Sequence, residues 1–358
     1  MQKCQSGDAA RLSKNCKYYN VEFLRIVFSI GIVCFHLFTN MIKYVGEDPL
    51  LLHLADKTKH AGMIVECFLI IAGFFLFYSL KNKPEQSWLE FSLNKIARLW
   101  PVFAFSIFCF VILSFIGFIK INFYTQFVNL FFLQCIGVTL EYKGINWYIS
   151  PFFWTMILYF GILKSFKIGK ANLIIAILTY FSFVGLINNF SGGFGRETFN
   201  IFFNAGLMRC LASIGIGYFV GCLHDRVKNC PEVFINRIEK CVKFVINYQN
   251  KLIYVIVFAI LFFLFILKQG LVSNITNLKI FEKAGCYAYS IYVMQQVSFY
   301  IMGGTLWKFA DFSDHKILVI LISLIFSVVI AIFTYHFIEL PVGRYLKNKF
   351  SLIFGFSK

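Results

Sequence analysis

The chain has 358 residues, of which 59% are hydrophobic, 20% aromatic and only 14% charged. A soluble domain carries about 25% charged residues because its surface faces water, so this composition excludes an ordinary soluble globule. The net charge of +17 comes from 34 Lys and Arg against 17 Asp and Glu. Because these cations lie mostly between apolar blocks, they favour lipid head groups or an anionic cosubstrate over nucleic acid as partners.

The apolar blocks predict an all-α fold, a polytopic bundle of about ten transmembrane helices. About 20 apolar residues are needed to cross a bilayer as a helix. The expected helices cover 22–42, 61–80, 99–119, 147–163, 171–188, 201–223, 252–267, 284–306 and 317–338. The segment 127–140 is apolar but short, so it could cross, re-enter the membrane or lie within the bundle. No second domain is expected, and the transmembrane domain is assigned to 21–340.

Lys and Arg gather at both ends of the chain. Residues 1–20 lack the apolar core of a cleavable signal peptide and, with the tail 341–358, carry the basic flanks Lys3, Arg11, Lys14, Lys17, Arg344, Lys347, Lys349 and Lys358. The positive-inside rule predicts that both termini and the polar stretch 225–251 are cytoplasmic. Ten spans satisfy this orientation but leave Lys164, Lys167 and Lys170 outside, so the topology of 120–200 stays open.

The first apolar block contains three ionisable residues, Glu22, Arg25 and His36. Eleven positions at about 100° each come within about 20° of three full turns, so Arg25 and His36 share a helix face, about 16 Å apart along the axis. Glu22 lies near the same stripe and can pair with Arg25. Charges inside membrane helices usually mark function. Arg25 is therefore a candidate anion ligand and His36 a candidate general base, against the alternatives of a snorkelling Arg25 and a packing His36.

Further charges stand at the start of later blocks. Glu66 precedes an apolar run and could pair with Arg25 or orient His36, or simply lie at the interface. Lys95 and Arg98 stand one helical turn apart just before an expected helix, which suits a phosphate site as well as an ordinary cytoplasmic helix entrance. Eleven Cys are scattered without a C-x-x-C pair or zinc spacing, so no metal site is expected.

Five blocks together resemble the membrane acyltransferase family 3, whose members acylate surface polysaccharides and other extracytoplasmic acceptors. The blocks are Glu22 to Arg25 with His36, Glu66 to Phe74, Lys95 to Pro101, Ser290 to Gln295, and Ile338 to Pro341. They look like that family's acid-x-Leu-Arg start with its Arg-to-His spacing, its Ser-Gly-Phe block, its Arg-x-x-Arg-x-x-Pro block, its Ser-x-x-x-Tyr-Leu-x-His helix and its closing Glu-x-Pro. Their order along the chain makes the resemblance specific.

The departures from the family pattern concern polar positions. Ala72 replaces the usual Ser, and Lys95 replaces an Arg, which keeps the charge but loses the guanidinium fork. Gln295 stands where His is common, so a proton-transfer role there would be lost while hydrogen bonding to a substrate remains open.

The resemblance implies an integral membrane O-acyltransferase that moves an acyl group, expected to be acetyl, from acyl-CoA to a hydroxyl of a cell-envelope glycan. It assigns catalysis to His36 and Glu66, phosphate binding to Arg25, Lys95 and Arg98, and supporting roles to Glu22, Gln295 and Glu339. The implied location is the bacterial cytoplasmic membrane. A glycan-precursor transporter and a non-catalytic component of an envelope assembly are the alternatives; only an acyltransferase would consume the CoA ester.

Overall fold

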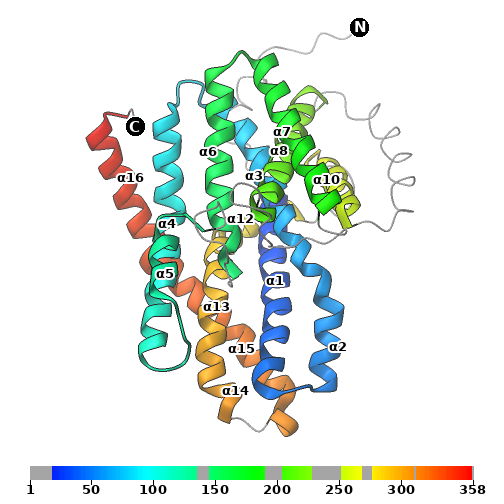
Figure 1. Ribbon diagram of the computed structural model, residues 1–358, viewed down its shortest axis with the longest axis vertical. Coiled ribbons are helices and arrows are strands. Elements are labelled where there is room, and N and C mark those ends of the chain that lie inside the picture. The colour runs from blue at the N-terminus through cyan, green and yellow to red at the C-terminus, as the bar shows by residue number, and fades with distance from the viewer. Residues whose placement is uncertain are drawn as a thin grey trace.

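The structure is a computed structural model that describes residues 18–134, 145–189, 204–227, 251–267, 276–309 and 312–356, and all regular elements in these ranges are helical. The first half contains α1 (Tyr19–Val45), α2 (Pro49–Thr58), η1 (Lys59–Met63), α3 (Ile64–Asn82), α4 (Trp88–Phe115), α5 (Phe123–Leu130), η2 (Ile145–Tyr148), α6 (Ile149–Ser165) and α7 (Ile168–Asn189). The second half contains α8 (Ala205–Val227), α10 (Lys251–Ile266), α12 (Ile280–Cys286), α13 (Ala288–Gly304), α14 (Leu306–Phe309), α15 (Phe312–Thr334), the π-helical turn η3 (Tyr335–Glu339) and α16 (Leu340–Phe354). The long helices form an elongated bundle (Figure 1).

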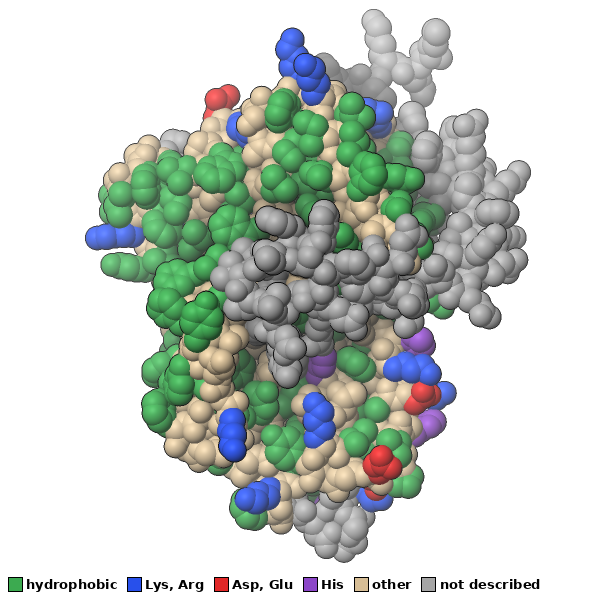
Figure 2. Space-filling view, in the orientation of Figure 1, with side chains coloured by type: hydrophobic (Ala, Val, Ile, Leu, Met, Phe, Trp, Pro, Cys, Tyr) green, Lys and Arg blue, Asp and Glu red, His purple; other side chains and the backbone are tan. Residues whose placement is uncertain are grey.

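The expected polytopic membrane fold is confirmed. Six helical stretches in the described part of the chain are long and apolar enough to cross a membrane: Tyr19–Val45, Pro49–Asn82, Trp88–Phe115, Ile168–Ile187, Ala205–Val227 and His315–Phe354. The apolar helices α6 and α13 have 17 residues each. Large hydrophobic side chains such as Phe108, Phe181 and Ile325 are exposed, and Figure 2 shows hydrophobic side chains spread over the visible face. A soluble monomer does not present so much apolar surface, whereas a lipid-facing bundle must.

Helices α3 and α8 cross with their backbones in contact, and glycine residues make this possible. A Cβ atom at Gly73 would collide with the backbone of Ile214 and Tyr218, and one at Gly217 would collide with the backbone of Ile70. Small residues at such positions let two helix backbones touch inside a membrane, where close packing replaces the hydrophobic effect as the driving force. Gly221, four residues after Gly217, also faces α3, where its Cβ position is 2.8 Å from the Phe77 side chain.

Helix α4 begins earlier than predicted. The expected helix started at residue 99, just after Lys95 and Arg98, but Ser87 caps α4 by accepting a hydrogen bond from the Glu90 amide at 3.1 Å. A helix of 28 residues follows and contains Pro101. Lys95 and Arg98 therefore lie inside the helix, not ahead of it. The cap outweighs the polar composition of the first turns because it satisfies otherwise unpaired amides.

Two observations bear on the topology of residues 120–200, which the sequence left open. Helix α5 has eight residues, too few to cross a bilayer. Lys164, at the end of α6, donates a hydrogen bond to the Pro84 carbonyl at 2.5 Å, so this end of α6 lies beside the α3–α4 connection with Lys81 and Lys83. The two basic clusters thus share one end of the bundle, which removes the conflict with the charge rule. The expected loop 225–251 lies mostly outside the described residues, but Asp225 belongs to α8 and pairs with Lys81 at 2.5 Å.

Gly217→Ala should destabilise the protein, because the new methyl group meets backbone atoms that cannot move aside. Overpacking of this kind costs about 1–3 kcal/mol or more. Thermal unfolding in detergent should show a midpoint several degrees below that of the wild type. Gly169→Ala in α7 is the matched control, since no atom lies within 4 Å of its Cβ position. Equal midpoints for the two variants would show that α3 and α8 do not pack this closely.

Candidate active site

A cavity of about 940 Å³ lies at the start of α1, between α3, α4, α6, α12, α13 and α16. Six basic side chains line it: Arg25, Lys83, Lys95, Arg98, Arg344 and Lys347. Three acidic side chains, Glu22, Glu282 and Glu339, accompany them. The cavity thus unites five of the residues predicted from sequence, Glu22, Arg25, Lys95, Arg98 and Glu339. Its excess of positive charge suits an anionic ligand.

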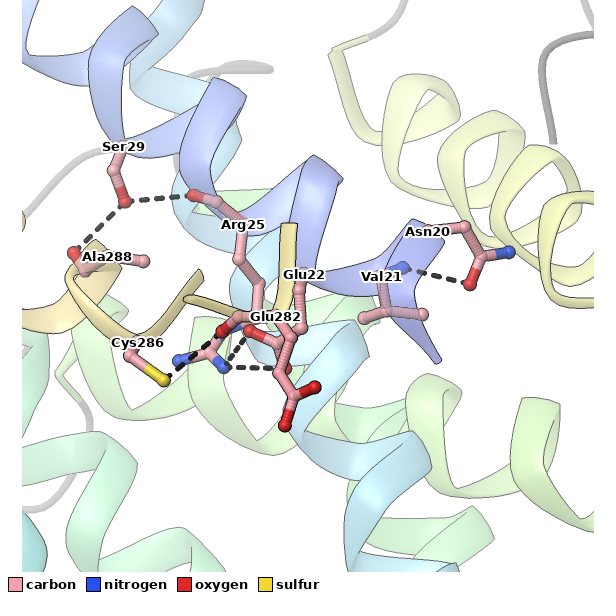
Figure 3. A network of polar contacts seen from close by, with 8 residues as sticks. All are labelled: Asn20, Val21, Glu22, Arg25, Ser29, Glu282, Cys286 and Ala288. Carbon is pink, nitrogen blue, oxygen red and sulfur yellow. Dashed lines mark hydrogen bonds and ion pairs between the residues drawn. The ribbon is translucent and has the colours of Figure 1, made fainter. Parts of the chain in front are cut away.

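Arg25 and Glu22 form the ion pair predicted from their spacing. The Arg25 Nη1 atom lies 2.8 Å from Glu22 Oε2, and the two side chains are 17% and 23% exposed (Figure 3). The Ser29 hydroxyl lies within hydrogen-bond distance of two backbone carbonyls, those of Arg25 and Ala288, and so connects α1 to α13. The Glu22 carboxylate packs against Gly285 of α12, where a Cβ atom would overlap the carboxylate. The pair holds Arg25 at the cavity wall and leaves part of its guanidinium group accessible to a ligand.

The α4 cations are placed by helix periodicity. Lys95 lies over two aromatic rings, with its Nζ atom 5.2 Å from the centroid of Phe91 and 5.7 Å from that of Phe152. A cation over an aromatic face is stabilised by the ring quadrupole and keeps its donors available. Arg98, three residues later, lines the same cavity. Lys95 and Arg98, the two cations predicted as a phosphate site or a helix entrance, thus lie within α4 and form one wall of the cavity.

Glu339 reaches the cavity through an irregular helix turn. The π-helical turn η3 separates α15 from α16, and Glu339 is its last residue. Such insertions often occur at functional sites, because the extra residue redirects the side chains that follow. Ser290 donates a hydrogen bond to Glu339 Oε2 at 2.6 Å, and its neighbour Tyr289 donates to the Leu99 carbonyl at 2.7 Å. These bonds join α13, α4 and η3 around the carboxylate.

Arg344 and Lys347 are site residues that the sequence reasoning used only for topology. Both lie on α16, one turn apart, within the segment expected as a cytoplasmic tail. Gly343 allows α16 to cross α4 closely, since its Cβ position is 2.9 Å from the Ala97 carbonyl oxygen. This crossing brings the two cations to the cavity that Lys95 and Arg98 line. The i, i+3 spacing of two basic residues after Glu-x-Pro was the available signal.

Glu66 pairs with Arg209 and not with Arg25, so one of the partners predicted for it is wrong. Its Oε1 atom lies 2.5 Å from the Nε atom of Arg209, and the two side chains are 2% and 4% exposed. The close α3–α8 packing turns Glu66 toward α8, where a buried carboxylate requires a cation. The Arg209 guanidinium carbon also lies 4.5 Å from the centroid of the Trp147 ring. Arg209 was missed, although a single arginine within an apolar block is itself a functional signal.

His36 and Gln295 do not line the cavity. His36 is half-buried, and its backbone carbonyl accepts hydrogen bonds from Asn40 and Thr39, while its ring centroid lies 4.9 Å from that of Phe35. Gln295 is fully buried in α13, where its Nε2 atom donates to the Tyr292 carbonyl at 2.8 Å. Tyr292 itself lines the cavity. Gln295 therefore contacts a lining residue without lining the cavity itself, and His36 lies farther along α1.

The fold and the cavity define a multi-pass integral membrane protein with a cationic site suited to an anionic ligand. An acyltransferase domain family matches residues 18–336 of the chain. The chain therefore belongs to the membrane acyltransferase family 3. Neither the curated proteins nor the solved structures gave a match. Glu339, Arg344 and Lys347 stand just beyond the matched range, although they complete the cavity.

Removing one partner of the Glu66–Arg209 pair should be more harmful than removing both. Glu66→Leu or Arg209→Met leaves an uncompensated buried charge, which costs about 3–5 kcal/mol, whereas the double variant replaces the pair with apolar side chains. Thermal unfolding in detergent should therefore give a higher midpoint for the double variant than for either single variant. A double variant whose loss equals the sum of the two single losses would contradict a direct pair.

Proposed function

We propose that this protein is an acyl-CoA-dependent O-acyltransferase that transfers an acyl group, expected to be acetyl, to a hydroxyl of a cell-envelope glycan. The observation that carries the proposal is the cavity of about 940 Å³ lined by six basic side chains from α1, the end of α3, α4 and α16. Its size falls within the range of sites for small ligands and cosubstrates. The family membership supports the reaction class, and the size and positive charge of the cavity support its proposed role in binding the acyl donor.

The lining residues fit the chemistry of acyl-CoA. Glu22 offsets the charge of Arg25, whereas Lys83, Arg344 and Lys347 have no ion-pair partner among the described residues. Phosphate groups would provide those partners through charge-assisted hydrogen bonds. Other aromatic side chains of the lining, such as Tyr19 and Tyr335, would offer contacts to an adenine ring. The segments around the cavity carry Lys and Arg residues from which the cytoplasmic side was predicted. Acyl-CoA would enter from that side.

His36 is the proposed general base. The acyl end of the donor would extend from Arg25 toward His36, about 16 Å along α1. His36 would accept the proton of the acceptor hydroxyl while the hydroxyl oxygen attacks the thioester carbonyl. The C–S bond would then break and release CoA. A route through an acyl-His36 intermediate balances equally well. Neither route assigns a step to Glu66, whose Oε1 atom is bound to Arg209.

His36→Ala should abolish most of the transfer. Loss of a general base reduces the rate by roughly 10²–10⁴-fold, while donor binding should change little because the phosphates are assigned to Arg25, Lys95 and Arg98. Mass spectrometry of the envelope glycan should show a gain of one acyl group with the wild-type protein and almost none with the variant. His53→Ala is the control, as His53 lies on the short helix α2 away from the cavity.

Full acylation by a stably inserted His36→Ala variant would refute the assigned role of His36. An unchanged glycan mass with the wild-type protein, together with glycan movement across the membrane and no loss of CoA ester, would identify a transporter instead.

Replacing both Arg344 and Lys347 with Ala should weaken the binding of acetyl-CoA by about 10- to 100-fold, the usual effect of losing one or two hydrogen bonds to charged groups. The affinity should also become less sensitive to salt, since fewer charges are paired. Equilibrium binding in detergent at two salt concentrations measures both effects. Lys349→Ala is the matched control, because Lys349 lies on the same helix but outside the cavity lining. Equal weakening by both variants would indicate a general surface charge effect.

A further inference from the structure

A second polar region lies within the bundle, separate from the cationic cavity. We call it the polar centre and define it by six residues from four segments: Glu66 (α3), Asn146 and Trp147 (η2), Asn204 and Arg209 (at the start of and within α8), and Gln295 (α13). All six are buried, with exposures of 4% or less. Polar groups are costly in such a place unless they are paired or serve a function.

Direct contacts connect one side of the polar centre. Glu66 binds Arg209 at 2.5 Å, and the Arg209 guanidinium lies over the Trp147 ring at 4.5 Å. Asn204 accepts a hydrogen bond from the Gly206 amide at 2.6 Å through its Oδ1 atom. A Cβ atom at Gly206 would lie 3.0 Å from the Trp147 ring, so α8 and η2 meet here without intervening side chains.

The other side of the polar centre is connected through α13. Asn146 donates from its Nδ2 atom to the Val293 carbonyl at 3.3 Å. Gln295 follows two residues later and donates to the Tyr292 carbonyl at 2.8 Å. The side-chain amides of both residues thus donate through their NH₂ groups to the α13 backbone, and their oxygen atoms remain unpaired.

Four buried atoms of the polar centre have no hydrogen-bond partner among the described residues: Glu66 Oε2, Asn146 Oδ1, Gln295 Oε1 and Asn204 Nδ2. Leaving such an atom unpaired in the interior is unfavourable, so several together indicate a site that a ligand completes. Three of the four are acceptors, and they require a ligand that donates hydrogen bonds. A thioester carbonyl only accepts, and a metal cation is disfavoured by the charge of Arg209. Hydroxyl groups can donate to all three.

The polar centre adjoins the donor cavity. Tyr148 and Tyr292 both line that cavity, and their rings meet edge to face with centroids 4.7 Å apart. Tyr148 follows Trp147 in the sequence, and the Tyr292 carbonyl accepts the hydrogen bond from Gln295. On the other side, a Cβ atom at Gly31 of α1 would lie 3.1 Å from Ile64, two residues before Glu66. The start of α3 therefore meets α1 between Arg25 and His36.

We propose that the polar centre binds the acceptor, a polyhydroxylated sugar unit, through Glu66, Asn146 and Gln295 as hydrogen-bond acceptors, with Arg209 and Trp147 fixing Glu66. This inference rests on the proposed acyltransferase function and assigns its second substrate. The acyl donor occupies the cationic cavity, and the sugar hydroxyl meets the acyl group beyond the Tyr148–Tyr292 pair. Gln295 acts here as a binding residue, which is consistent with the glutamine that stands where the family commonly has His.

The test compares Gln295→Met with Gln296→Met in the full-length protein. Both changes keep the side-chain length and remove an amide, but Gln296 is outside the polar centre and bonds to Tyr300 on its own helix. Acetyl transfer from radiolabelled acetyl-CoA to envelope glycan extracted from cells lacking the protein gives separate KM values for the two substrates. Gln295→Met should raise the KM for the glycan about tenfold, the effect of one lost hydrogen bond, and leave the KM for acetyl-CoA unchanged. Gln296→Met should change neither.

Thermal unfolding provides a readout that does not depend on turnover. Without substrate, Gln295→Met should be as stable as the wild type or more stable, because it removes an unpaired buried oxygen. Added glycan should raise the midpoint of the wild type and of Gln296→Met more than that of Gln295→Met. If the wild type consumed no acetyl-CoA, the proposed reaction would fail while this comparison still decided whether the polar centre binds the glycan.

Three results would overturn the inference. An unchanged glycan KM in a more stable Gln295→Met variant would mean that the polar centre holds only water. A raised KM for acetyl-CoA would assign the centre to the acyl donor. A strongly lowered unfolding midpoint without substrate would give Gln295 a purely structural role.

Discussion

The close crossing of α3 and α8 is the constraint on which the remaining structure depends. Glycine at positions 73 and 217 lets the two backbones touch, and the Glu66–Arg209 ion pair lies at one end of the same interface. A buried pair of this kind contributes little net stability, because desolvation offsets most of the attraction between the charges. It does make the register specific, since any sliding of one helix along the other would leave a charge unpaired. Trp147 and the residues around it pack against this fixed unit.

The two polar regions of the interior differ in how their charges are balanced. In the cavity, basic residues outnumber acidic ones, and Glu22 and Glu339 hold individual cations or backbone segments in place without cancelling the positive charge. In the polar centre, Glu66 and Arg209 neutralise one another, and what remains unpaired is mostly hydrogen-bond acceptors. An excess of cations selects an anion, whereas neutral, unpaired acceptors select hydroxyl groups. The bundle thus offers chemically distinct environments on either side of one tyrosine pair.

Helix α16 illustrates how a segment outside the hydrophobic core can complete a site. It has no buried residues among those described, yet Gly343 packs against α4, and Arg344 and Lys347 line the cavity. The π-helical turn before it changes the direction of the chain and carries Glu339 to the same place. Arg344 and Lys347 are exposed, so their charges would act on an anion in solution over a longer range than that of Arg25, whose side chain is 17% exposed.

The membrane location and the Glu22–Arg25 pair followed from the sequence alone. Apolar block length is set by bilayer thickness, and helical spacing within one segment is fixed by the backbone, so both are local properties. Residues far apart in sequence were different. Only the tertiary structure decided that Glu66 pairs with Arg209, that Lys95 and Arg98 lie within α4, and that Arg344 and Lys347 join them at the cavity. These outcomes depend on which helix faces which, and that choice is made by close backbone contacts at Gly73, Gly217 and Gly343, whose partners no local pattern reveals.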